Sequence, residues 1–233
     1  MLRHGLICVV FLQQFIALAL SEGSYPYYAR LYNDLFQDYN PRLLPAKDAS
    51  APVNSTIGMT LINLKLDTSA GSLYTNVWLQ QDWHDFRLQW DPEGYDGITQ
   101  ITVPYDQVWR PDMSLFNSDK PQDMNPPSDE GNVVVFSSGN VLFVRHVGLS
   151  SLCMPNDQGP NGEQHCEMKI GSWVNSGYRL DVYNSNDKID LTSYAGNPDW
   201  TITKTLAKRH VRHYSCCPEP YVDITFSIWF KEK

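Results

Sequence analysis

The stretch with the clearest chemical potential is Tyr214-Ser-Cys-Cys-Pro-Glu-Pro-Tyr221, in which two adjacent cysteines stand between two tyrosines. The Cα atoms of adjacent residues lie about 3.8 Å apart across a trans peptide, below the roughly 4.4–6.8 Å that relaxed disulfides prefer. A bond between Cys216 and Cys217 would close no long loop, so it would add little stability. We interpret this stretch as a shaped aromatic surface rather than a structural staple.

A metal site is the first alternative for the same region. His210 and His213 precede Cys216 and Cys217 closely, and mixed clusters of histidine and cysteine bind zinc. On an extended strand, however, residues three apart point to opposite faces. An oxidised cysteine pair also cannot ligate a metal, so we expect none here.

A hydrolytic site is the second alternative. The sequence contains no Gly-x-Ser-x-Gly elbow, and its polar clusters at 82–85 and 163–165 are typical of solvated strand and loop residues. There is no glycine-rich loop of the kind that cradles phosphate. We therefore expect neither catalysis nor a cofactor.

Residues 1–20 have a basic start, a short apolar run and small residues near Ala17 and Ala19. This pattern predicts a secretory signal peptide, followed by one domain over residues 21–233. No later apolar stretch is long enough to span a bilayer, so we expect a secreted, extracellular protein. The net charge of −8 argues against a nucleic-acid partner.

Four cysteines follow the predicted signal peptide, and four cysteines allow three pairings. Secretion favours oxidation, and sequence proximity favours Cys153 with Cys166 and Cys216 with Cys217. Asn54-Ser-Thr is an N-glycosylation sequon, and the prolines at 45 and 52 predict a loop around it.

The elements that must position these residues are mainly strands. Apolar residues at helical spacing predict one short helix over 26–40. From Ile57 onward, apolar and polar residues alternate with a period of two, and the final strand has the most regular alternation. The strands are expected at 57–67, 73–90, two within 133–147 folded at 137–140, and about 166–174, 178–184, 200–213 and 221–231. This order predicts an all-β fold, an immunoglobulin-like antiparallel β-sandwich.

The tryptophans recur in ordered motifs: Trp78-Leu-Gln-Gln-Asp-Trp83, Trp109-Arg-Pro-Asp112 and Lys169-Ile-Gly-Ser-Trp173. With the cysteines at 153 and 166 and the vicinal pair, this set resembles the extracellular ligand-binding domain of nicotinic, Cys-loop pentameric receptors. It resembles the soluble acetylcholine-binding relatives of that domain still more closely. The resemblance implies about ten strands behind an N-terminal helix, assembled as a homopentamer with ligand sites between subunits.

The resemblance also implies which residues would bind the ligand. One subunit would supply a principal face, with the Cys216–Cys217 loop closing over it: Phe116, Trp173, Tyr214 and Tyr221. The neighbouring subunit would supply a complementary face: Trp78, Val134, Phe136, Leu142 and Val144.

The implied ligands are acetylcholine, nicotine and related cationic small molecules. Aromatic faces attract such a cation by about 0.5–2 kcal/mol per ring, without the desolvation cost of a buried carboxylate. Packing in the core is the alternative role for any ring, and we favour it for Trp83, Trp90 and Trp109. Because Trp78 and Trp83 are an odd number of residues apart, they should point to opposite faces of their strand.

Two features depart from the receptor pattern. Phe116 stands where the family usually has tyrosine, so a hydroxyl is lost and we expect some agonists to bind more weakly. The 153–166 loop is polar and glycine-rich, whereas receptors carry an apolar element there that packs on the channel. We therefore favour a soluble binding protein over a truncated receptor ectodomain. A secreted esterase acting on choline esters is the remaining alternative.

Overall fold

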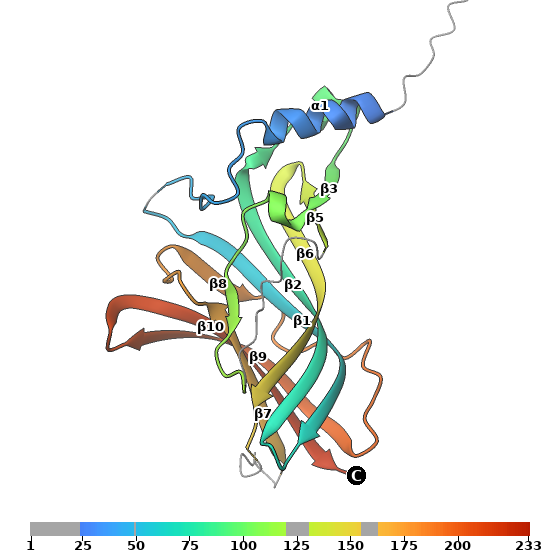
Figure 1. The fold of residues 1–233 in the computed structure, drawn as a ribbon, viewed down its shortest axis with the longest axis vertical. Coiled ribbons are helices and arrows are strands. Elements are labelled where there is room, and N and C mark those ends of the chain that lie inside the picture. The colour runs from blue at the N-terminus through green and yellow to red at the C-terminus, as the bar shows by residue number, and fades with distance from the viewer. Residues whose placement is uncertain (1–23, 49, 120–130, 155–162) are drawn as a thin grey trace, which may run out of the picture.

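A single helix and two β-sheets account for the regular structure of the chain (Figure 1). The computed structural model describes residues 24–48, 50–119, 131–154 and 163–233. The predicted signal peptide at 1–20 lies outside the described residues. Ten strands are present in the described part, so the all-β sandwich with a short N-terminal helix is confirmed.

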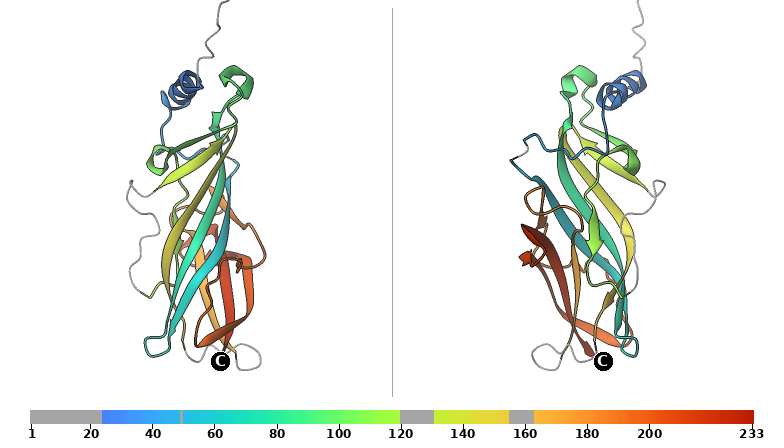
Figure 2. Two further views of the ribbon diagram at one scale, coloured as in Figure 1. Left: turned by 90° about the vertical axis from the view of Figure 1, so that its right-hand side faces the viewer. Right: turned by 60° about the vertical axis from the view of Figure 1, so that its left-hand side comes forward.

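Helix α1 (Tyr25–Phe36) begins with a proline in its first turn, where a missing N–H costs no hydrogen bond. It buries Leu31 and ends four residues earlier than the sequence predicts. The helix lies at one end of the molecule (Figures 1 and 2) beside the 3₁₀ turn η1 (Pro92–Tyr95). The Tyr95 hydroxyl donates a hydrogen bond of 2.8 Å to Asp34, which joins the two elements.

The larger sheet has six strands in the order β3-β5-β6-β2-β1-β8. Its strands are β1 (Val53–Asp67), β2 (Ser72–Gln89), β3 (Gln100–Pro104), β5 (Asn132–Phe136), β6 (Ser138–Leu152) and β8 (Leu180–Asn184). The β1–β8 pair is parallel, whereas the other pairs are antiparallel. The sequence-based description of the sandwich as antiparallel thus has one exception.

The smaller sheet has four strands in the order β4-β7-β10-β9. These strands are β4 (Met113–Leu115), β7 (Gln164–Ser172), β9 (Trp200–Tyr214) and β10 (Cys217–Glu232). Figure 2 shows the two sheets facing each other over the lower part of the molecule. The long β9–β10 hairpin extends beyond them to one side (Figure 1).

The core fills the space between the sheets with apolar side chains from both. Trp83 and Trp109 meet edge to face there, with ring centroids 6.3 Å apart, as expected for two core rings. Beside them Asp85 is fully buried, accepting a hydrogen bond of 2.7 Å from the Tyr39 hydroxyl and pairing with Arg87 at 2.7 Å. Burial, together with the Asp85 carboxylate, raises the pKa of Tyr39, so its hydroxyl stays protonated.

The β5–β6 hairpin turns where the sequence predicts it, next to Ser138-Gly139. Gly139 has a φ of +84°, and a Cβ there would lie 2.7 Å from the backbone oxygen of Asp85. Only glycine fits this position, because it has no Cβ to clash or to strain the left-handed backbone.

Three local expectations differ from the structure. The sequence does not predict the short strands β3 and β4, because neither is long enough to show a clear period of two. The sequon is not in a loop: Asn54 is exposed within β1, directly opposite Asp181 of β8. On β10 both faces are buried, because side chains of the flanking strands cover the polar one; Asp223 is 2% exposed.

No helix among the described residues is long and apolar enough to cross a membrane.

Candidate functional site

Two tyrosines and the vicinal cysteines occupy the tip of the β9–β10 hairpin. Tyr214 ends β9 and lies opposite Cys217, the first residue of β10. The Tyr214 and Tyr221 rings meet edge to face with centroids 5.8 Å apart, and Tyr214 is 47% exposed. Cys216 and Cys217 form a disulfide with Cα atoms 3.8 Å apart, so the favoured cysteine pairing is confirmed.

A second pair of rings lies where β4 and β7 end. Phe116 directly follows β4, and Trp173 directly follows β7. Their ring centroids are 5.9 Å apart at an interplanar angle of 64°, and Trp173 is 69% exposed. So large an exposed fraction means that most of the Trp173 indole is not packed in the core.

Asp112, in the Trp-Arg-Pro-Asp motif, holds the loop that carries Trp173. One carboxylate oxygen accepts hydrogen bonds from the Ser172 hydroxyl at 2.6 Å and the Asn175 amide at 2.7 Å. The other accepts the Val174 backbone N–H at 2.7 Å. The residues on both sides of Trp173 are therefore fixed by one carboxylate, and Asp112 is a positioning residue.

The two ring pairs are held at the same end of the smaller sheet. The Gly177 N–H donates to the carbonyl of Pro220 at 2.7 Å, which ties the loop after Trp173 to the hairpin. Gly171 of β7 allows Phe116 to lie close: a Cβ there would be 2.9 Å from the Phe116 ring and 2.4 Å from a β10 carbonyl. Phe116, Trp173, Tyr214 and Tyr221 thus form one exposed or half-exposed aromatic group, which we call the principal face.

The other predicted residues lie on the outer face of the larger sheet. Trp78 is 40% exposed, whereas Trp83 on the same strand is 3% exposed, so the prediction that they face opposite sides is confirmed. The remaining predicted residues, half-buried or exposed on neighbouring strands, are Val134, Phe136, Leu142 and Val144. Together with Trp78 they form the complementary face. In Figure 1 β5 and β6 lie toward one side of the sandwich, and the β9–β10 hairpin extends toward the other.

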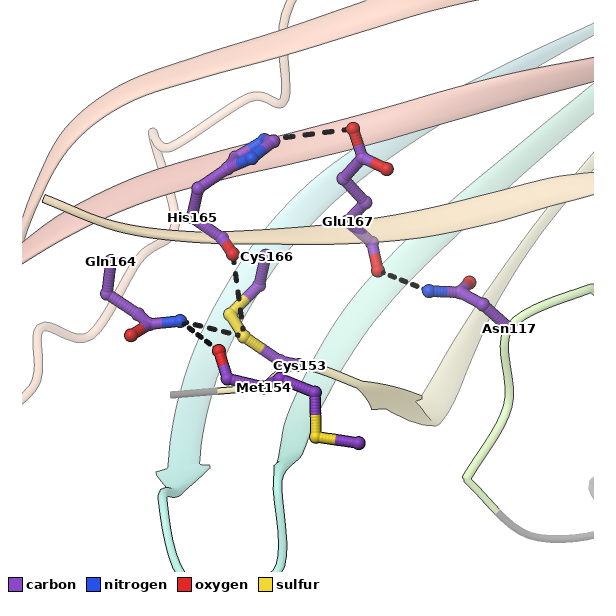
Figure 3. Close-up of a disulfide and its surroundings, with 7 residues drawn as sticks. All are labelled: Asn117, Cys153, Met154, Gln164, His165, Cys166 and Glu167. Atoms are coloured by element: carbon purple, nitrogen blue, oxygen red, sulfur yellow. Dashed lines mark hydrogen bonds and ion pairs between the residues drawn. A yellow bond between two sulfur atoms is a disulfide. The ribbon is translucent and has the colours of Figure 1, made fainter. Parts of the chain in front are cut away.

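The Cys153–Cys166 disulfide connects the two sheets (Figure 3). Cys153 directly follows β6, Cys166 lies in β7, and the two Cα atoms are 5.2 Å apart. Gln164 donates to the carbonyl of Met154 at 2.9 Å, next to the disulfide (Figure 3). In the polar loop between Cys153 and Cys166, residues 155–162 lie outside the described residues.

Asn117 fixes the chain that carries Phe116. Its side chain donates to the Glu167 carbonyl at 2.8 Å (Figure 3) and accepts the Lys169 N–H at 2.9 Å. The backbone of Phe116 also donates to the carbonyl of Lys169 at 2.7 Å. The side chains of Asn117 and Asp112, together with the backbone hydrogen bonds, therefore hold the segments that carry Phe116 and Trp173.

Three of the four residues considered as metal ligands have other partners. Both cysteines of the hairpin are oxidised, and His210 lies 3.2 Å from the buried carboxylate of Asp223. Asp223 also accepts a hydrogen bond of 2.7 Å from Arg212, and this bond raises the pKa of the Arg212 guanidinium. Within the described residues, no group of three or more His, Cys, Asp or Glu side chains is placed to hold a metal ion.

Sequence reasoning misses two side chains next to the predicted rings. Asp112 stands out in the sequence only as part of a motif, and its role depends on partners about sixty positions away. His146 lies opposite Trp78 on β6 and accepts a hydrogen bond from the indole N–H through Nε2. The period of two that places Leu142 and Val144 on this face also places His146 there, so a signal is present.

Comparison with known proteins identifies the class of domain. The family described as neurotransmitter-gated ion-channel ligand binding domain matches residues 28–233. The chain therefore belongs to this family, as the sequence motifs and the fold both indicate.

The chain is similar to several acetylcholine receptor subunits. It is 34% identical to the human neuronal acetylcholine receptor subunit alpha-9 over 93% of this chain and 45% of that protein. It is also 34% identical to the acetylcholine receptor subunit alpha-type acr-16 of Caenorhabditis elegans, over 88% of this chain and 41% of that subunit. The human neuronal alpha-10 subunit matches at 34% over 88% of this chain and 45% of its own length. The chain thus spans less than half the length of these relatives.

Proposed function

We propose that this domain binds acetylcholine, nicotine and related cationic small molecules in an aromatic cage between neighbouring copies of the chain. The protein acts as a soluble, secreted homopentamer without a pore or catalytic activity. The observation that carries the proposal is the principal face itself. Four rings from three separate segments form two pairs at the same end of the smaller sheet, and the largest, Trp173, is 69% exposed.

Aromatic faces suit a ligand whose positive charge cannot be neutralised. Each ring attracts an ammonium by about 0.5–2 kcal/mol, with the higher values in desolvated sites. Three or four rings would therefore supply several kcal/mol, and micromolar affinity requires about −8 kcal/mol in total. Phe116 contributes a face without a hydroxyl, so its contribution is confined to this attraction and to packing.

A second copy of the chain would complete the cage. The principal face belongs to the smaller sheet and its hairpin, whereas the complementary face covers the outside of the larger sheet. Joining one face to the other on the next copy makes a head-to-tail interface, and such an interface generates a closed ring when the rotation between copies closes. The number five comes from the resemblance to the pentameric receptors.

Secretion is supported by three features of the chain. Residues 1–20 have the pattern of a signal peptide, both disulfides are of the kind formed in oxidising compartments, and Asn54 of the sequon is exposed. We propose that Asn54 carries a glycan. Its position in β1, with the side chain directed to solvent, leaves room for one.

A second candidate function comes from the share of the relatives that the chain covers. The match to less than half of each receptor subunit fits an ectodomain that continues into a channel. The two candidates share the ligand site, and they differ in whether a channel domain is joined after Lys233. Sequencing the complete transcript past that codon separates them: a reading frame that continues into apolar segments supports the receptor.

The direct test is calorimetric titration of the purified protein with acetylcholine and nicotine, paired with light scattering. We expect one ligand per subunit interface and a mass of five chains. A Trp173→Ala variant should lose most of the affinity, whereas Trp200→Ala, which removes a half-buried ring packed edge to face on Phe230 away from the cage, should keep it. A monomer that binds neither ligand refutes the proposal.

A further inference from the structure

The complementary face contains an imidazole in direct contact with its tryptophan. His146 of β6 stands opposite Trp78 of β2, and the indole Nε1–H donates a hydrogen bond to the imidazole Nε2. The ring centroids are 5.7 Å apart at an interplanar angle of 31°. The orientation of the exposed indole is thus determined by a titratable neighbour.

We propose that His146 is a positioning residue for Trp78 and makes cation binding depend on pH. This inference rests on the proposed function. Nε2 can accept a hydrogen bond from the indole N–H only while His146 is neutral and carries its own proton on Nδ1. Uptake of a proton at Nε2 turns the acceptor into a donor, so two N–H groups face each other and the bond breaks.

The imidazole can exchange protons with solvent. His146 is exposed, and beside it lies a cavity of about 310 Å³. The cavity is lined by His146 itself and by Ile62, Asn63, Asn76, Val147 and Gly148. Asn76 donates to Asn63 at 3.0 Å, so the polar floor of this cavity is made of neutral amides.

Charged groups on the surrounding strands face the imidazole only at a distance. On β1, Lys65 lies beyond Asn63 and stands opposite Tyr74. On β2, Asp82 lies four residues from Trp78 and accepts a hydrogen bond of 2.9 Å from Gln80. On β6, Arg145 is directed over the Phe143 ring, toward the other face of the sheet. Beyond β1, Asp190 accepts a hydrogen bond of 3.3 Å from Thr60, which stands opposite Trp78. His146, by contrast, is in direct contact with the indole.

Two consequences of protonation act in the same direction. The indole loses the bond that orients it, and a positive charge appears beside the ring that should attract the cationic ligand. Both weaken cation binding as the pH falls. A lost hydrogen bond and a partly screened repulsion correspond to an affinity about three- to tenfold lower at pH 5.5 than at pH 8.0.

The experiment uses tetramethylammonium, whose own charge does not change with pH. Calorimetric titration at pH 8.0 and 5.5 compares the wild type with His146→Gln, which offers the indole an oxygen acceptor but takes up no proton. The control is His213→Gln, a change beside Tyr214 but outside the four rings of the principal face. We expect the acid-induced loss in the wild type and in H213Q, and a change below twofold in H146Q.

A ligand-free measurement separates the two proposals. A protonated imidazole in contact with an indole quenches its fluorescence, so the wild type should dim more than H146Q between pH 8.0 and 5.5. The stacked pair of His165 and Trp229, with ring centroids 4.4 Å apart, is present in both proteins and cancels in the comparison. Equal dimming in both proteins overturns the contact, and equal acid loss of affinity in both overturns the role in binding. Absence of tetramethylammonium binding at either pH refutes the proposed function, and the fluorescence comparison then still tests the contact.

Discussion

Asp112 offers the sharpest test of how the principal face is built. Replacing it with asparagine keeps the shape of the side chain but exchanges one carboxylate oxygen for an NH₂ group. The remaining oxygen can still accept from Ser172 and Asn175. The NH₂ group then faces the Val174 backbone N–H, so the hydrogen bond of 2.7 Å is replaced by two opposed donors.

The size of the effect depends on that one bond. A hydrogen bond to a charged group contributes about 1.5–3 kcal/mol, and the half-buried position of Asp112 places it at the lower end. If the loop conformation that binds the ligand becomes less stable by about 1.5 kcal/mol, binding becomes roughly tenfold weaker. Calorimetric titration of Asp112→Asn with acetylcholine measures this, and thermal unfolding measures the accompanying loss of stability.

Asp67→Ala is the matched control for general destabilisation. Asp67 accepts three hydrogen bonds, from the N–H and hydroxyl of Ser69 and the N–H of Ala70. These bonds close the turn between β1 and β2, at the bottom of Figure 1 and away from the rings. We expect the control to unfold at a lower temperature yet bind normally. Wild-type affinity in Asp112→Asn would mean that the carboxylate does not position Trp173.

Three further predictions concern the core, the cage and the hairpin. Asp85→Ala should cost about 3 kcal/mol in urea unfolding, because it leaves the partly buried Arg87 without its carboxylate; a loss below about 1 kcal/mol contradicts this. Phe116→Tyr should strengthen binding of some agonists by about 0.5–1.5 kcal/mol, and unchanged titrations for every agonist would show that the missing hydroxyl is irrelevant. Mild reduction of Cys216–Cys217 should weaken binding while the far-ultraviolet circular dichroism persists; unfolding on selective reduction would identify a structural staple.

Most of the fold could be predicted because its long strands have strong periodic signals. β2 is long enough for the alternation of apolar residues to define its buried face. The alternation in β10 identifies it as a strand, although both of its faces are buried. The parallel β1–β8 pair could not be predicted, because alternation gives the buried face of a strand but not the direction of its neighbour. Pro52 is typical of a loop and so suggests that the sequon lies in one. In the structure, however, β1 begins at the next residue, Val53, and includes the sequon.

The site divides into rings that the sequence reveals and partners that it conceals. Trp173, Tyr214 and Tyr221 stand in ordered motifs, so their exposure could be expected. Asp112 and His146 act on rings some sixty positions away in the chain, and only the strand pairings bring them into contact. The period of two places His146 on the same face as Val144, but its contact with Trp78 depends on the pairing of β6 with β2. The ligand chemistry proposed for the cage can therefore be inferred from its aromatic residues, whereas the proposed response to pH requires the strand pairing that brings His146 to Trp78.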